Sequence, residues 1–366
     1  MKEIISPNTV IAKYISETID ILQPKIKLKK PKEIIFYIGT NINGTPHFAT
    51  AMVHCVGFMF AKKIRDKFNI STKVVVGIHD NISYESKVDS ENITYHKSFF
   101  HSFGLEKIND LIKKHYGEYL QKLSDKLNVF YEIEIYSEVQ KRKIFRETFL
   151  NTFSQKESVG RCISPSTGKL QIRIPCPICH FSDRDAKKTI SYFINEELHI
   201  KSFCVEHGIY KSVITKNNDT FIDLTTLHRN FVKEISTINE AGTMYVMVKG
   251  GDWLYSTATI DLAFSTIGKT LLETPSRIFT PQIVTDSGAK LSKSLISADD
   301  KSLKNIPSWL LDLGEFKKEF GHDYLDKITE FTEELFRDPR NMYRTYTVEE
   351  IINLLSNQST GSPDTF

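Results

Sequence analysis

Short apolar runs that alternate with long helical patterns are the feature that most restricts the fold of this chain. Residues 33–39 (EIIFYIG) and 73–78 (KVVVGI) have the length and composition of strands buried on both faces, and residues 129–135 (VFYEIEI) form a third strand pattern. Helical spacing covers residues 48–69 and residues 105–127. Strands that alternate with helices build βαβ units, so the sequence predicts an α/β protein with a parallel sheet.

This alternation breaks off and later resumes. A segment with paired cysteines, short β-like runs and turn residues interrupts it, and strand character returns at residues 243–248. We therefore expect four parts: the first half of the core (1–155), a cysteine-containing insertion (156–220), the second half of the core (221–300), and a short helical extension with a disordered tail (301–366).

Composition excludes some classes of protein and leaves others open. The net charge of +3 at pH 7 does not by itself indicate a nucleic-acid partner, although it permits a local basic groove. No run reaches the about 20 apolar residues of a membrane span, and the N-terminus lacks the apolar core of a signal peptide. We expect no membrane association and a cytoplasmic location.

The cysteines indicate a metal site. Their number is odd, at 5, and three of them cluster, which favours metal binding in a reducing compartment over disulfides. Two Cys-x-x-ligand turns offer four soft ligands for a closed, structural Zn²⁺ site, namely Cys176, Cys179, Cys204 and His207. His180 is adjacent and could replace one ligand, whereas Cys162 is expected to be a plain thiol.

A loop after the first strand is typical of a phosphate site. The run 33–39 leads into a loop containing Asn43 and Gly44, and a helix then starts near His47. At such a junction backbone N–H groups and the helix dipole point at an anion. His47 can donate a hydrogen bond to a phosphate oxygen and Thr50 can do the same, although a histidine at a helix start is also often structural.

Lysines and glycines further along the chain complete the candidate site. Lys290-Leu-Ser292-Lys293-Ser follows a glycine, and two lysines on such a mobile loop can offset charge on a leaving pyrophosphate. The alternative is an ordinary exposed Lys/Ser loop. Gly250-Gly251-Asp252 follows a strand, so its backbone permits close approach and its carboxylate can accept hydrogen bonds from a ribose. Asp252 could equally cap the next helix.

The order of these segments resembles that of the class I aminoacyl-tRNA synthetases. The lysine loop at 290–294 differs at one apolar position from their signature Lys-Met-Ser-Lys-Ser. His47-Phe-Ala49-Thr50 keeps the first histidine and the apolar residue of their signature His-Ile-Gly-His, but has Ala49 for the glycine and Thr50 for the second histidine. The resemblance covers roughly residues 33–300 and implies a Rossmann-type (HUP-like) nucleotide-binding core.

Within that class the chain looks most similar to the lysine-specific class I enzymes. His79-Asp80-Asn81 follows the second strand where those enzymes have an acidic cluster, and their insertion also carries a zinc knuckle. Members of full length add a large helical domain that reads the anticodon, and residues 301–366 are too few to build it. The resemblance places Tyr37, Trp253 and Tyr255 as candidate walls of an amino-acid pocket, although each could be ordinary core packing.

The resemblance implies a ligase that activates an amino acid, lysine or another, as its adenylate with ATP and Mg²⁺. In this hypothesis His47 and Thr50 hold phosphates, Asp252 holds the ribose, and Lys290 and Lys293 stabilise the leaving pyrophosphate, with Asn43, Gly44, Gly250, Gly251 and Ser292 completing the ATP site. The acceptor is either a tRNA 3′ end or a small amine, peptide or carrier. Two alternatives stay open: a catalytically silent paralogue, which Ala49 and Thr50 favour, and a plain nucleotidyltransferase, which the lysine loop disfavours.

Overall fold

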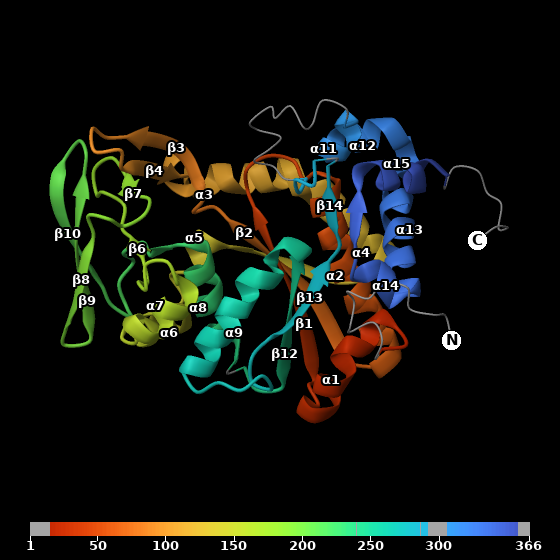
Figure 1. Ribbon diagram of the computed structural model, residues 1–366, viewed down its shortest axis with the longest axis horizontal. Helices are drawn as coiled ribbons and strands as arrows, with labels where there is room; N and C mark the ends of the chain where they lie inside the picture. The colour runs from red at the N-terminus through yellow and green to blue at the C-terminus, as the bar shows by residue number, and fades with distance from the viewer. Residues whose placement is uncertain (1–14, 239, 286, 292–305, 358–366) are drawn as a thin grey trace.

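A five-stranded parallel sheet forms the centre of the molecule (Figure 1). The computed structural model describes residues 15–238, 240–285, 287–291 and 306–357. Every neighbouring pair of strands in the sheet is parallel, which confirms the predicted α/β class. The strand order is β13 (Ser276–Thr280), β12 (Thr243–Gly250), β1 (Glu33–Asn41), β2 (Ser71–His79), β5 (Tyr131–Ile135).

The two faces of β1 pack against different neighbours because its side chains alternate. Ile34, Phe36 and Ile38 are buried in the main core with α2 (Phe48–Phe68). Tyr37 lies on the opposite face in a small apolar cluster with Ile35, Val75 and Met247. The second face is therefore only partly filled with apolar side chains, and this leaves space for a cavity above it.

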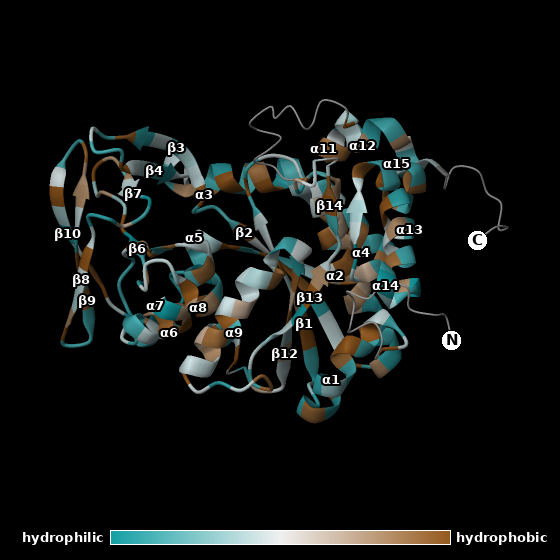
Figure 2. Cartoon of the chain, in the orientation of Figure 1, coloured by the Kyte–Doolittle hydropathy of each residue, from teal (hydrophilic) through white to brown (hydrophobic). Residues whose placement is uncertain are grey.

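Helices close the main core on the α2 side. The elements there are η2 (Thr18–Leu22), α1 (Gln23–Lys29), α3 (Phe99–Ile112), the π-helical turn η3 (Lys113–Gly117) and α4 (Glu118–Leu127). Brown and teal segments alternate along α3 and α13 in Figure 2, the pattern of helices with one buried face. No helix within the described ranges combines the length and apolar character of a membrane span.

A second core lies outside the central sheet and includes no residue of its five strands. It unites the helices that flank the insertion, α5 (Tyr136–Val139), α6 (Lys143–Phe153), α7 (Lys156–Ile163), α8 (Thr226–Ile238) and α9 (Leu254–Thr266). Between α7 and α8 the chain forms β6 (Ile172–Arg173), β7 (Ser182–Asp183), β8 (Ile190–Ile194), β9 (Glu197–Cys204), β10 (Gly208–Ile214) and β11 (Asp223–Leu224). β7 pairs with β4 (Thr94–Ser98), the partner of β3 (Ser83–Val88), so the insertion is anchored to a hairpin that follows β2. This arrangement does not test where one domain ends and the next begins, so the domain boundaries stay predictions.

The expected helical extension is present and shares the main core. It comprises α11 (Ser308–Leu311), α12 (Leu313–Phe320), η6 (Gly321–Asp323), α13 (Tyr324–Arg337), α14 (Pro339–Met342), β15 (Thr345–Thr347) and α15 (Val348–Asn357). Phe48, the first residue of α2, lies between Phe316 and Phe331, with ring centroids 5.4 and 5.6 Å away. The backbone N–H of Leu313 donates to the carbonyl of Pro46 (2.9 Å), and β15 pairs in parallel with β14 (Gln282–Val284). The predicted disordered tail lies outside the described residues.

Candidate active site at the carboxyl ends of the strands

A cavity of about 500 Å³ opens where the carboxyl ends of β1 and β12 meet the N-terminus of α2. The chain leaves β1 toward β2 on one side, and β12 returns on the other side, so this is the switch point of the sheet. Parallel α/β sheets bind ligands at such points, since no crossover helix covers the gap there. The volume lies within the about 300–1,000 Å³ common for small-molecule sites.

The α2 end of the cavity presents hydrogen-bonding groups suited to phosphate. His47 is the N-cap of α2, where its Nδ1 accepts from the N–H of Thr50 (3.4 Å) and its Nε2 lies 3.2 Å from Thr50 Oγ1. Asn43 can donate to a phosphate oxygen from Nδ2, whereas its Oδ1 is a buried acceptor with no hydrogen-bond partner among the described residues. Asn43, His47, Ala49 and Thr50 all line the cavity. Gly44 does not line it and instead supplies a turn with φ +83°.

The loop after β12 crosses directly beneath the cavity. A Cβ on Gly251 would lie 2.8 Å from the carbonyl oxygen of Thr280, which is too close for any larger residue without movement of the backbone. Asp252 faces the cavity from the short helix η4 (Gly251–Trp253). Because Trp253 is the N-cap residue of α9, the structure does not use Asp252 as the cap of that helix.

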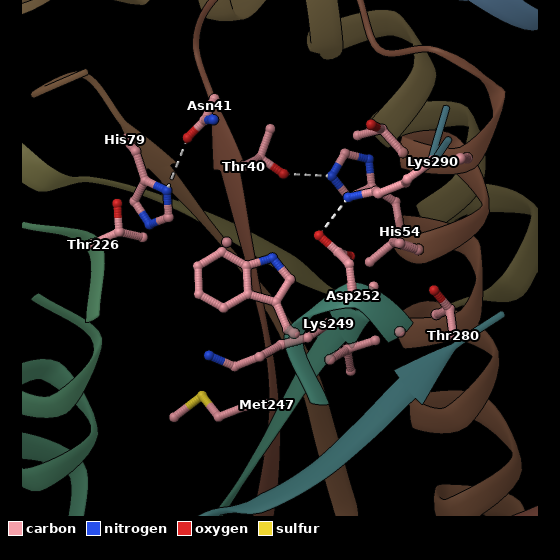
Figure 3. A pocket seen from close by; sticks show the side chains of 18 of the residues that line it. Thr40, Asn41, His54, His79, Thr226, Met247, Lys249, Asp252, Thr280 and Lys290 are labelled. Atoms are coloured by element: carbon pink, nitrogen blue, oxygen red, sulfur yellow. Dashed lines mark hydrogen bonds and ion pairs between the residues drawn. The ribbon is translucent and has the colours of Figure 1, made fainter. Parts of the chain in front are cut away.

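Lys290 joins the lysine loop to this segment. Its Nζ bonds Asp252 Oδ2 at 2.5 Å (Figure 3). A bridge to Val284 and the hydrogen bond from the N–H of Leu291 to the carbonyl of Ile283 (2.9 Å) fix its position on the cavity wall. Two segments that are far apart in the sequence therefore meet at one ion pair. Ser292 and Lys293, the other expected residues of this loop, lie outside the described residues.

The opposite end of the cavity is lined by α8, which the sequence did not suggest as part of the site. Lys233 Nζ lies 3.7 Å from the centroid of the buried Tyr37 ring. Burial, reinforced by Lys249, lowers the pKa of Lys233 to about 7. Arg229 lies one helical turn earlier and donates from Nη1 to Asn81 Oδ1 (2.6 Å). The only signal for these residues was their i, i+4 spacing, which is equally typical of a solvated helix face.

A buried ion-pair cluster supports the floor. Glu234 is fully buried; its Oε2 accepts from Arg277 Nη2 (2.5 Å, on β13), and its Oε1 forms an ion pair with Lys249 Nζ (3.3 Å, on β12). Lys249 also lies 5.3 Å from the centroid of Trp253, which holds this ring against the cavity. Of the three expected aromatic walls, Tyr37 and Trp253 line the cavity, whereas Tyr255 is 80% exposed and does not.

Two histidines that line the cavity were also not predicted as site residues. His54 Nε2 lies 2.7 Å from Thr40 Oγ1, which ties α2 to the end of β1 (Figure 3). His79 Nδ1 lies 3.3 Å from Asn41 Oδ1, and burial with nearby cations holds the pKa of His79 well below its ordinary value. His79 is therefore neutral at pH 7. Asp80 is buried, and its Oδ1 accepts from the N–H of Ser137 (3.1 Å), outside the cavity lining.

The cysteine knuckles converge as a candidate metal centre. The ligand atoms of Cys176, Cys179, Cys204 and His207 all lie within 4.8 Å of one another. The separations Cys179 Sγ–Cys204 Sγ (3.4 Å) and Cys204 Sγ–His207 Nδ1 (3.6 Å) are close to the about 3.7 Å between ligands 2.3 Å from a tetrahedral Zn²⁺. His180 stacks on His101 instead, with ring centroids 4.9 Å apart. The residues therefore fit a structural zinc ion.

Comparisons with known proteins give a likeness of fold only. No family model matches the chain, and no curated protein matches it. Among solved structures, the chain resembles a glutamate-tRNA synthetase from Elizabethkingia anophelis at 12% identity and a TM-score of 0.41, over 89% of this chain and 70% of that chain. It resembles a glutamate tRNA ligase from Elizabethkingia meningosepticum in complex with its amino acid at 12% identity and a TM-score of 0.42, over 89% of this chain and 69% of that chain. It also resembles a Mycobacterium tuberculosis methionyl-tRNA synthetase in complex with methionyl-adenylate at 10% identity and a TM-score of 0.40, over 88% of this chain and 68% of that chain. At these identities and TM-scores the likeness says nothing of the reaction, and lysine specificity stays a prediction.

Proposed function

We propose that the chain activates a carboxylic acid, in the first place an amino acid, by adenylation. A carboxylate oxygen of the acid attacks the α-phosphorus of ATP, the bond to the β,γ-pyrophosphate breaks, and an acyl-adenylate forms. The observation that carries the proposal is the meeting of the α2 N-terminus, Asp252 and Lys290 around one cavity. A cavity that only held a cofactor would not need a lysine loop beside the phosphate end.

Each end of the cavity has a part in this reaction. The N-terminal end of α2, with His47 and Thr50, and Asn43 in the preceding loop would bind phosphate oxygens through N–H and side-chain donors. Asp252 would accept from the ribose hydroxyls once Lys290 turns from it to the pyrophosphate, where developing negative charge binds the ammonium more strongly. Lys293 is proposed for the same role. Catalysis then comes from positioning and charge stabilisation.

Metal ions have different roles in this proposal. Mg²⁺ would arrive on the phosphates of ATP, because Asp252 is the only carboxylate among the described residues that line the cavity. Zn²⁺ would be bound by the three cysteines and His207 and would hold the insertion together without entering the chemistry. The activated acyl group would pass to a tRNA 3′ end or to a small amine, peptide or carrier.

Pyrophosphate exchange into ATP tests the proposal. The purified chain is incubated with ATP, Mg²⁺, labelled pyrophosphate and each amino acid in turn, with and without tRNA. We expect exchange with one acid or a small group of acids. Exchange without tRNA supports a separate acceptor, and dependence on tRNA supports a synthetase proper. ATP binding without any exchange would contradict adenylation and favour the silent paralogue.

A further inference from the structure

The α8 end of the cavity carries positive charge that no neighbouring carboxylate matches. The charged side chains among the described lining residues are Arg229, Lys233, Lys249, Lys290 and Asp252. Lys290 is paired with Asp252 and Lys249 with Glu234. Neither Arg229 nor Lys233 has a carboxylate oxygen within 4.0 Å in the described part of the chain. Two basic side chains on one helix turn therefore have no acid partner at this end. Arg229 is charged, and Lys233, whose pKa burial lowers to about 7, takes up a proton more readily once an anion binds beside it.

Both cations are buried, so their charge is costly unless a ligand supplies an anion. Arg229 is 3% exposed and Lys233 is 9% exposed. The Nε atom of Arg229 has no hydrogen-bond partner among the described residues, and Lys233 Nζ lies over the Tyr37 ring. Asp223, the carboxylate that favours the charged form of Arg229, is already paired with Arg173 (2.8 Å). An anionic group bound in the cavity would therefore offset the charge of Arg229 and Lys233.

That anionic group is separate from the phosphates of ATP. His79 and Thr226 lie on the side of the cavity opposite Lys290 and Thr280 (Figure 3). Arg229 and Lys233 come from the same helix as Thr226, whereas the phosphate donors belong to α2. Thr226 and Asn230 line this end too and can donate hydrogen bonds to carboxylate oxygens. The site therefore has one anion-binding region for the nucleotide and a second for the acid.

We infer that the acid activated here carries a second carboxylate, which Lys233 and Arg229 bind. This inference rests on the proposed function and names its substrate class: glutamate, aspartate or a dicarboxylic acid without an amino group. A lysine substrate would place its ammonium group against two buried cations, so the charges disfavour the lysine specificity that the resemblance suggested. Asp252, the only carboxylate among the described lining residues, is paired with Lys290, so the cavity wall offers no second carboxylate there for an α-ammonium group, and the substrate class includes acids without one.

Pyrophosphate exchange with a charge-graded panel tests the inference. The panel contains glutamate, aspartate, glutarate, glutamine, lysine and leucine. We expect a dicarboxylate to give a KM at least about 10-fold below that of glutamine, since one charge-assisted hydrogen bond is worth about that factor. A neutral or basic amino acid as the best substrate would overturn the inference and leave the proposed function standing.

Lys233→Met removes the charge and keeps the alkyl packing on Tyr37. It should raise the KM for the dicarboxylate about 10- to 100-fold and leave the KM for ATP unchanged. Lys318→Met, at a side chain that is 75% exposed, is the matched control and should change neither. An equal rise in the KM for ATP would assign Lys233 to the phosphates and overturn the inference. Circular dichroism checks that the variant folds.

If no acid supports exchange, the proposed function fails and ligand binding still tests the charge argument. The thermal unfolding midpoint is then measured with saturating glutamate, glutarate or glutamine. A rise with glutamate or glutarate alone, absent in Lys233→Met, supports the dicarboxylate site. No rise with either dicarboxylate, or an equal rise with glutamine, overturns it.

Discussion

Glu234→Gln should be one of the most destabilising single substitutions in the chain. Glu234 is fully buried and is the shared partner of Lys249 and Arg277. Glutamine keeps the shape and one acceptor oxygen but removes the negative charge. Arg277 retains its ion pair with Asp261, so the loss falls mainly on Lys249, whose side chain is 12% exposed and has no second acid partner among the described residues.

The size of the effect follows from that imbalance. Breaking a buried ion pair from one side costs about 3–5 kcal/mol, because the other charge is left buried and unpaired. The rescue of Arg277 by Asp261 places the expected loss near the lower limit, about 3 kcal/mol. Urea denaturation measures it, with fluorescence from Trp253 near Lys249 and from Trp309 in the C-terminal helices.

Two further variants isolate the cause. Glu315→Gln removes a carboxylate from an exposed pair with Lys318 and should change the free energy of unfolding by about 0–0.5 kcal/mol. Glu234→Gln combined with Lys249→Met should lose less than the sum of the single variants, since the second change removes the unpaired charge. A loss below about 1 kcal/mol for Glu234→Gln would refute the ion-pair reasoning.

The remaining predictions concern acid, metal, backbone and catalysis. Burial alone would raise the pKa of Glu234, but Lys249, Arg277 and Lys233 hold this pKa below its ordinary 4.5. The contribution of Glu234 to stability is therefore present above pH 4.5 and is lost as the pH falls through the lower folded pKa. Urea titrations at graded pH measure this loss, and stability that does not fall on acidification would contradict the prediction. Cys176→Ser should release zinc, measured by elemental analysis; a metal-free, fully folded wild-type chain would refute the site. Gly251→Ala should lower the free energy of unfolding in urea by about 1–3 kcal/mol and weaken ATP binding, because the added Cβ would clash with the carbonyl oxygen of Thr280. An unchanged ATP affinity would argue against a close approach of the nucleotide to the backbone at Gly251. Lys290→Met should slow pyrophosphate exchange by about 100-fold, against an unchanged Lys318→Met control, and equal rates would exclude Lys290 from the mechanism.

The strands were predictable where burial on both faces leaves a continuous apolar run. β1 and β2 extend the runs at 33–39 and 73–78 by a few residues, and β12 does the same for 243–248. β13 was missed because it forms an edge of the sheet, where only alternate residues need to be apolar. Its sequence, SRIFT, carries an arginine that is buried because Glu234 and Asp261 neutralise it.

The site was predictable only where a short motif carries its own chemistry. The cysteine spacing predicted the cluster because all four ligands come from two tight turns. The lysine loop and the Gly250-Gly251-Asp252 segment were recognisable in the same way. Arg229 and Lys233 were not, because whether a basic residue on a helix faces water or a cavity depends on how that helix packs against the sheet.

The contact of the C-terminal helices with α2 has a consequence for how the chain can be dissected. Phe316 and Phe331 enclose the residue next to His47, and Leu313 holds the carbonyl just before it. Under the proposed function, nucleotide affinity and the docking of these helices would therefore be thermodynamically linked. A shortened protein that ends before α11 would expose the Phe48 ring to water and loosen the turn at His47, so under the proposed function these helices would also determine how firmly the phosphate end of the cavity is held.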